Sequence, residues 1–164
     1  MNLPRHLDFT DLQPLLLDCL KAGGEATFAV TGTSMFPFFM CRRDSVVLTA
    51  CDPETLRVGD IPLYLRANGQ AVLHRLAAVT ENGFTMNGDG HKALESGVAK
   101  SAVVGVTTAV IRKGKRRKIG AARYRIYAFF WRHTRWCRRP LILFCWAVYG
   151  RASYRKWNKP QPKL

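Results

Sequence analysis

The sequence predicts a mainly β protein of the α+β class: a compact antiparallel β domain with an N-terminal helix and a basic helical extension at the C-terminus. Short segments rich in Val and Leu fill the middle of the chain and are separated by turn signals. Helical periodicity is confined to the two ends. We therefore expect an amphipathic helix (1–24), a β domain (25–112) and a basic, aromatic-rich helical tail (113–164).

The first element is an amphipathic helix over residues 10–22. Thr10 or Asp11 could cap its start, and Gly23-Gly24 would end it as a C-cap. Its apolar side chains recur at the spacing of a single helical face, at Leu12, Leu15, Leu16, Cys19 and Leu20.

The β domain follows as a series of short strands. Turn signals containing Asn-Gly or Gly-Asp-Gly lie at 67–69, 81–83 and 88–90. Strands joined by such turns, with no helices alternating between them, indicate an antiparallel arrangement. The predicted strands are residues 25–31, 45–50, 60–65, 70–79, 84–87 and 102–112.

The tail is predicted to form two helices, over 119–136 and 140–149. The first ends near Arg138-Arg139-Pro140 because proline cannot continue an established helix, and Pro140 suits the start of the second. We see no internal repeat in this part or elsewhere in the chain.

Charge is divided unevenly between the tail and the rest of the chain. Residues 112–164 contain 17 Lys and Arg and no acid, whereas residues 1–111 contain 9 Lys and Arg against 11 Asp and Glu. The net charge of +15 therefore belongs to the tail, which also holds all four tryptophans. Such an asymmetry indicates an anionic partner for that part.

Three interpretations of the tail remain open. Its basic and aromatic residues suit an anionic membrane surface, contacted through residues 113–157. They also suit single-stranded nucleic acid, through phosphate contacts and base stacking. In the third interpretation, both helices fold back on the β domain. We favour the membrane because residues 141–149 are apolar on every side.

No metal site or cofactor is expected. The five cysteines include no Cys-x-x-Cys pair, which argues against a zinc site and a paired disulfide framework. No phosphate loop, dinucleotide fingerprint or metal-ligand cluster occurs.

The longest apolar run, 141–149, is shorter than the ~20 residues that span a bilayer. Residues 1–24 carry three aspartates and lack the apolar centre of a secretory signal. We therefore expect a cytoplasmic protein, either free or attached peripherally to the inner face of the membrane.

Two motifs carry candidate chemistry. The run from Thr31 to Pro37 places Ser34 in a turn led by Gly32, and His74 lies in an otherwise apolar strand. Serine is a weak nucleophile unless a base takes its proton, and histidine, with an ordinary pKa near ~6.5, is the usual base. The two motifs predict a Ser34/His74 dyad.

These motifs resemble the nucleophile and base boxes of the signal peptidase I and LexA-like serine peptidases. Gly-x-Ser-Met-x-Pro is similar to the first box, and His74-Arg75 to the second. Gly59-Asp60, Asn87-Gly88-Asp89 and the Val-x-Gly strand at 103–106 resemble further elements of the family, in the family's order. The resemblance covers residues 25–112. It implies a β domain of that type and a serine endopeptidase that cleaves an extended leader-like or signal-like peptide after small residues.

The resemblance also implies supporting residues. Asp89 matches an acid in the family's Gly-Asp turn, and Glu95 approximates a second acid, where aspartate is commoner. Either could orient His74. The family's additional oxyanion hydroxyl falls at Gly32 here, so Thr33 or the backbone N–H near Ser34 would serve. Apolar residues around the serine could line the substrate groove or could simply be core; they include Met35, Phe36 and Phe38.

Other interpretations stay open. Ser34 could be an ordinary turn residue, His74 a core histidine, Asp89 a plain turn residue, and Lys92 an alternative base. The alternative function is a non-catalytic or self-cleaving regulatory module whose tail binds a membrane surface or nucleic acid. One short helix before residue 25 leaves no room for a helix-turn-helix, which opposes a DNA-binding form of that module.

Overall fold

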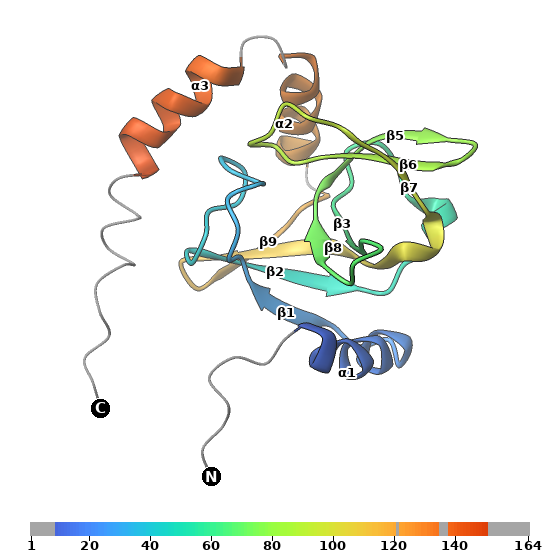
Figure 1. Cartoon of the computed structure of the whole chain (residues 1–164). Helices are drawn as coiled ribbons and strands as arrows, with labels where there is room; N and C mark the ends of the chain where they lie inside the picture. Colours follow the sequence, from blue (N-terminus) through green and yellow to red (C-terminus); the bar gives the residue numbers. More distant parts are fainter. Residues whose placement is uncertain (1–8, 121, 135–137, 151–164) are drawn as a thin grey trace.

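The protein contains two antiparallel β sheets, with helices contributed by the two ends of the chain (Figure 1). The computed structural model describes residues 9–120, 122–134 and 138–150. This architecture confirms the mainly β, α+β class. The ends of the predicted N-terminal and tail segments, 1–8 and 151–164, lie outside the described residues.

The first sheet has the strand order β1-β2-β8-β3-β4, and β9 pairs with β8 beyond β3. All of its pairings are antiparallel. The edge strands β1 and β4 are short, while the central β8 is the longest strand and pairs with three others. The strands are β1 (Ala26–Ala29), β2 (Asp44–Thr49), β3 (Pro62–Leu65), β4 (Ala71–Leu73), β8 (Val103–Arg112) and β9 (Lys115–Lys118).

The second sheet is a three-stranded meander in the order β5-β6-β7. It consists of β5 (Arg75–Thr80), β6 (Gly83–Asn87) and β7 (Glu95–Val98). The predicted strand at 70–79 is therefore two strands that belong to different sheets. His74 is the only residue between them, so the chain passes from one sheet to the other at this position.

Helix α1 (Phe9–Lys21) packs against the first sheet. Its buried residues Leu16 and Leu20 form a cluster with Leu48 and Leu63. Its C-terminus is a Schellman motif: the N–H of Gly24 donates to the carbonyl of Cys19, that of Gly23 to Leu20, and Gly23 has φ 77°. The predicted C-cap is confirmed, whereas the predicted N-caps Thr10 and Asp11 lie inside the helix.

Strand β9 was not expected, because the tail was predicted to begin at residue 113 and to contain only helices, over 119–136 and 140–149. Lys113 and Gly114 have φ angles of 53° and 73° and form a two-residue turn between β8 and β9. Such turns need positive φ at both positions and match the twist of paired strands. The first sheet therefore extends past the predicted boundary at 112. Strand β7 was also missed, since its Glu-Ser-Gly-Val sequence has little strand propensity.

Helix α2 (Ala122–His133) follows β9 and packs against the β domain. Tyr124 and Tyr127 lie against a core cluster that includes Phe38 and Ile61. Helix α3 (Arg138–Cys145) continues into a π-helical turn (Trp146–Gly150). Both predicted tail helices are thus present. No helix in the described ranges is long and apolar enough to cross a bilayer.

Candidate active site

Ser34 lies in the turn that follows β1. The turn is closed by a hydrogen bond from the N–H of Phe36 to the carbonyl of Thr33 (3.0 Å). Met35, the residue after Ser34, is buried in a core cluster with Phe38. Ser34 itself is half-buried and Thr33 is exposed. The buried neighbours therefore anchor a turn whose hydroxyl groups lie near the surface.

The serine turn docks on the loop after β6. The N–H of Gly90 donates to the Ser34 carbonyl at 2.7 Å. A Cβ atom at Gly88 would lie 2.7 Å from that carbonyl oxygen and 3.1 Å from Nε2 of His74. The side chain of His74 and the backbone of Ser34 therefore approach the same point, and only glycine leaves enough room between them.

His74 lies at the junction of the two sheets and is 6% exposed. Its Nδ1 is 3.2 Å from the hydroxyl of Tyr64, and this hydroxyl donates to Oε2 of Glu95 at 2.7 Å. Because the Tyr64 proton is directed to Glu95, its oxygen accepts from His74. This assigns the proton to Nδ1 and leaves Nε2 as the acceptor. Nε2 is the atom that faces Gly88 and the serine turn.

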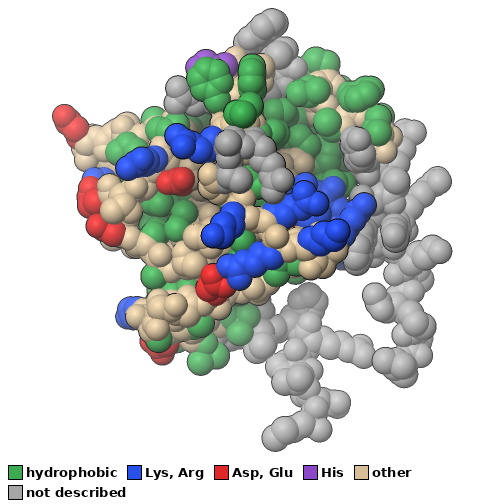
Figure 2. Space-filling view, turned by 180° about the vertical axis from the view of Figure 1, so that it is seen from behind, with side chains coloured by type: hydrophobic (Ala, Val, Ile, Leu, Met, Phe, Trp, Pro, Cys, Tyr) green, Lys and Arg blue, Asp and Glu red, His purple; other side chains and the backbone are tan. Residues whose placement is uncertain are grey.

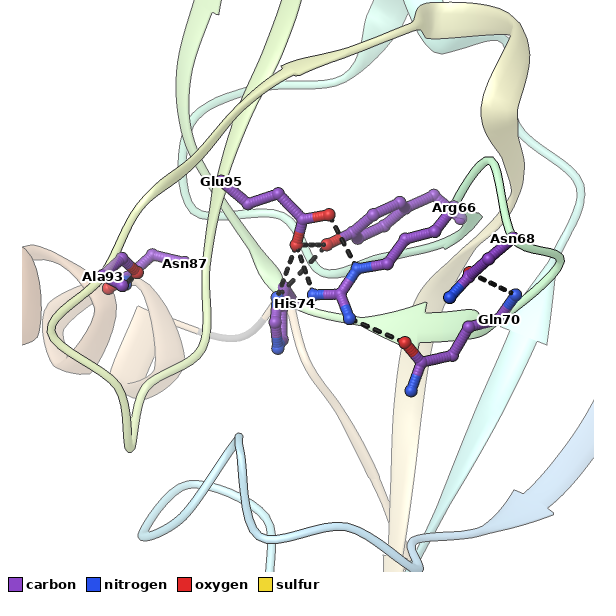
Figure 3. Close-up of polar contacts among 8 residues, drawn as sticks. Arg66, Asn68, Gln70, His74, Asn87, Ala93 and Glu95 are labelled. Carbon is purple, nitrogen blue, oxygen red and sulfur yellow. Dashed lines mark hydrogen bonds and ion pairs between the residues drawn. The ribbon is translucent and has the colours of Figure 1, made fainter.

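Arg66 fixes the far end of this chain of hydrogen bonds. Its Nε and Nη2 donate to the two oxygens of Glu95 at 2.7 and 2.6 Å, and its Nη1 donates to Gln70 (Figure 3). The hydrogen bond from Arg66 lowers the pKa of Glu95 to about 2, so the carboxylate stays ionised at neutral pH. Glu95 also lies 3.8 Å from Nδ1 of His74.

The pKa values support the same proton positions. Burial lowers the pKa of His74 to about 4, and the negative charge of Glu95 opposes this shift only in part. His74 is therefore neutral at pH 7 and able to accept a proton. Burial, followed by the hydrogen bond to Glu95, raises the pKa of Tyr64 far above its usual range, so its phenol stays protonated.

Asp89 has different partners from those expected of an orienting acid. Its two oxygens accept from Nε and Nη2 of Arg75 at 2.9 and 2.7 Å, and both side chains are buried. Arg75 lies over the ring of Phe38 and also donates to the carbonyl of Gly59. The indole of Trp131 donates to the Asp89 carbonyl. Asp89 therefore links β5, the loop after β6 and α2, and of the two predicted acids Glu95 is the one connected to His74.

The residues predicted to line a substrate groove are buried. Met35, Phe36 and Phe38 are 2%, 6% and 6% exposed. Met35 and Phe38 belong to the core, and the ring of Phe36 lies 5.9 Å from that of Trp146. These side chains act as core residues, which was the other interpretation of the pattern.

Tyr64 and Arg66 were not among the predicted site residues. They are two positions apart in an extended segment, so their side chains leave the same face of it. The sequence did contain a signal for these two residues. It places a tyrosine and an arginine on one face of the segment that precedes the strand with the histidine. Lys92, the alternative base, is exposed. His91 is exposed as well, and its ring lies 6.1 Å from that of His74.

A separate cavity of about 1420 Å³ opens between the β domain, β9 and α2, and neither Ser34 nor His74 lines it. Arg75 and Asp89 form part of its wall. No group of His, Cys, Asp and Glu side chains suited to a metal ion occurs within the described parts of the chain.

No known protein family matches the sequence, and no curated protein is significantly similar to it.

Proposed function

We propose that this protein is a serine endopeptidase of the signal peptidase and LexA-like type, with Ser34 as nucleophile and His74 as general base. The observation that carries the proposal is the chain of hydrogen bonds from His74 through Tyr64 to Glu95. It keeps the proton on Nδ1 and leaves Nε2 free to accept another beside the serine turn. The mainly antiparallel β architecture is compatible with this family.

In the proposed reaction, Oγ of Ser34 attacks a peptide carbonyl carbon while its proton passes to Nε2 of His74. The imidazolium keeps its Nδ1–H on Tyr64, and the ionised Glu95 stabilises the positive charge. Nε2 then protonates the leaving amine as the C–N bond breaks. Water then attacks the acyl carbon while Nε2 of His74 takes its proton, and His74 returns this proton to Oγ of Ser34 as the ester C–O bond breaks and the acid product leaves.

The tetrahedral intermediate needs hydrogen-bond donors near Ser34. The backbone N–H groups of Ser34 and Met35 donate to no other group among the described residues. They are the candidates for the oxyanion site, and the exposed hydroxyl of Thr33 is a further donor. In a Ser/His peptidase, donors placed in this way gain a partner when the oxyanion forms in the transition state.

The edge strands β1 and β4 of the first sheet support an extended peptide as the substrate. Strand β4 ends at Leu73, directly before His74, and β1 leads into the turn that holds Ser34. Edge strands have unpaired backbone groups that can bind a peptide by strand addition. A leader-like or signal-like peptide with small residues at the cleaved bond fits the resemblance of the sequence motifs.

A mass-spectrometric cleavage profile tests the proposal. The purified protein is incubated with a proteome-derived peptide library beside Ser34→Ala, His74→Ala and the matched control Ser101→Ala, which removes an exposed hydroxyl elsewhere. We expect defined cleavage by the wild type and by Ser101→Ala, and none by the other two.

Identical products from all variants would show a contaminating protease. No product from the wild type, together with no self-cleavage by intact mass, would contradict the proposed activity. Self-cleavage that depends on Ser34, without cleavage of any peptide, would favour the regulatory module.

A further inference from the structure

Helices α2 and α3 expose large apolar side chains away from the β domain. Phe129 and Phe130 on α2 are 60% and 61% exposed, and Leu143 and Phe144 on α3 are 66% and 64% exposed. Other exposed apolar residues extend the patch, namely Ile126 on α2 and Leu141 on α3. We call these six residues the apolar patch. A patch of this kind on a soluble surface marks an interaction site.

The part of the patch on α2 is not the result of an undocked helix. The opposite side of α2 is held by Tyr124 and Tyr127, whose rings lie 5.5 and 4.8 Å from that of Phe38. Trp131 is buried and donates to the Asp89 carbonyl. The helix therefore folds back on the β domain with one side, as one interpretation of the tail expected. Its other side remains exposed.

Basic residues lie beside the part of the patch on α2. Lys118 on β9 and Arg125 on α2 line the same cavity as Phe129. Lys113, Lys115 and Arg117 are also exposed, although Lys115 and Arg117 leave the strand on the side opposite to Lys118. Figure 2 shows Lys and Arg side chains gathered on this face beside hydrophobic ones. Residues 112–164 supply no acid that could neutralise them. A partner of this face must therefore carry negative charge and also offer an apolar region into which the exposed side chains can be buried.

We propose that this face binds the surface of an anionic lipid bilayer, with the apolar patch in the headgroup and acyl boundary and the basic residues on the phosphates. Anionic bilayers meet both requirements at once. Single-stranded nucleic acid meets the second only in part: its bases can stack on Phe129, Phe130 and Phe144, but Ile126, Leu141 and Leu143 offer no ring and would stay in water. A second copy of the chain would bring two strongly positive surfaces together.

This surface lies next to the serine turn. Trp146, directly after α3, contacts Phe36, two residues beyond Ser34. A bilayer bound to the patch would therefore bring the candidate dyad close to peptides that emerge from or lie on the membrane. This last step, unlike lipid binding itself, rests on the proposed peptidase function.

The test is co-sedimentation of the full chain with vesicles of phosphatidylcholine alone or mixed with phosphatidylglycerol. We expect binding to the mixed vesicles and at least tenfold weaker binding to neutral ones. A Phe130→Glu, Phe144→Glu double variant removes apolar contacts, and a Lys118→Glu, Arg125→Glu variant reverses the charge of the two basic residues that line a cavity with Phe129. Each should reduce binding to mixed vesicles at least about tenfold. The matched control is Leu15→Glu, which places the same charge on the exposed face of α1 at the opposite end of the molecule (Figure 1).

Circular dichroism must show that each variant folds like the wild type. Ser34→Ala should bind vesicles normally, so a failed peptidase assay leaves this inference standing. Equal binding by the double variant, the charge-reversed variant and Leu15→Glu would overturn it, as would absence of binding to either vesicle. Tight binding to single-stranded RNA without vesicle binding would assign the face to nucleic acid.

Discussion

Tyr64 has two hydrogen-bond partners, and its role follows from the direction of the two bonds. The hydroxyl donates to Glu95 and accepts from His74, so it transmits the orientation of the fixed carboxylate to the imidazole. An acid that contacted the histidine directly would hold its proton more strongly. The hydroxyl places a neutral group between two titratable ones, which helps to keep His74 neutral.

The first prediction concerns this hydroxyl. Tyr64→Phe leaves the ring but removes the acceptor of His74 Nδ1, and an unsatisfied buried donor costs about 1–3 kcal/mol. We expect kcat/KM for a cleaved peptide to fall about tenfold to hundredfold while the protein stays folded. The control is Tyr124→Phe on α2, which removes a hydroxyl from another ring. Equal kcat/KM values for the two variants would show that Tyr64 does not position the base.

The second prediction separates the two acids at the site. Asp89→Asn leaves the buried guanidinium of Arg75 without its carboxylate, which should lower the free energy of unfolding by about 3–5 kcal/mol. Glu95→Gln changes a half-buried residue, so it should affect kcat/KM more than stability. Urea denaturation and peptide cleavage of both variants give the two quantities. A stable but inactive Asp89→Asn protein would instead make Asp89 the orienting acid.

At the scale of elements, the loop after β6 sets the distance between Ser34 and His74. Gly88 and Gly90 let the backbone of the serine turn approach this loop closely, and the Gly90 N–H fixes the contact. Three parts of the chain thus meet at the site: the turn after β1, the β4–β5 junction and this loop. None of them is a neighbour of another in the sequence.

The third prediction tests that close approach. Gly88→Ala would put a methyl group 2.7 Å from the Ser34 carbonyl oxygen and 3.1 Å from Nε2 of His74. The backbone must shift, which should cost about 1–3 kcal/mol of stability and most of the activity. Gly32→Ala is the matched control, because its methyl group would meet no atom within 4 Å. A Gly88→Ala protein as stable and active as Gly32→Ala would rule out this geometry.

At the scale of the whole molecule, burial of neutral His74 makes stability depend on pH. In the unfolded chain the imidazole takes up a proton near pH ~6.5, but in the folded protein it does so only near its pKa of about 4. Between these values the unfolded state binds more protons, so stability is complete above pH ~6.5 and falls as the pH drops toward 4. The loss should reach about 2–3 kcal/mol.

Urea denaturation at pH 7.5 and pH 5 checks this fourth prediction. In the His74→Gln variant, residue 74 no longer titrates between pH 5 and pH 7.5. This variant should therefore lose clearly less stability between the two pH values than the wild type. The lowered pKa of Glu95 adds a separate loss only as the pH falls below its ordinary value of about 4.5. Equal losses for wild type and His74→Gln would contradict a buried neutral histidine.

The sequence was sufficient for the fold class and for the two motifs, because both depend on local patterns. Turn residues and short apolar segments predicted most of the strands, and Gly23-Gly24 predicted the end of α1. Residues joined only by tertiary contacts were harder to predict. Whether Asp89 or Glu95 connects to His74 depends on which strands pair, and Arg75 could have taken either carboxylate.

The missed elements have a related cause. β9 consists of four basic residues, which by propensity suit a helix as well as a strand, and its pairing with β8 decides the outcome. The break between β4 and β5 at His74 was not predicted either. The alternation of apolar side chains continues across it, and only the strand pairing assigns the two strands to different sheets. Val72 and Leu76, on either side, pack in one cluster with Tyr64.

The single-residue junction at His74 ties the candidate base to both sheets at once. The residues before it pair with β3 and those after it pair with β6. The two sheets also share one apolar cluster, and the N–H of Leu76 on β5 donates to the carbonyl of Asp60, just before β3. The position of the imidazole therefore depends on strand pairings on both sides of it rather than on the conformation of a single loop.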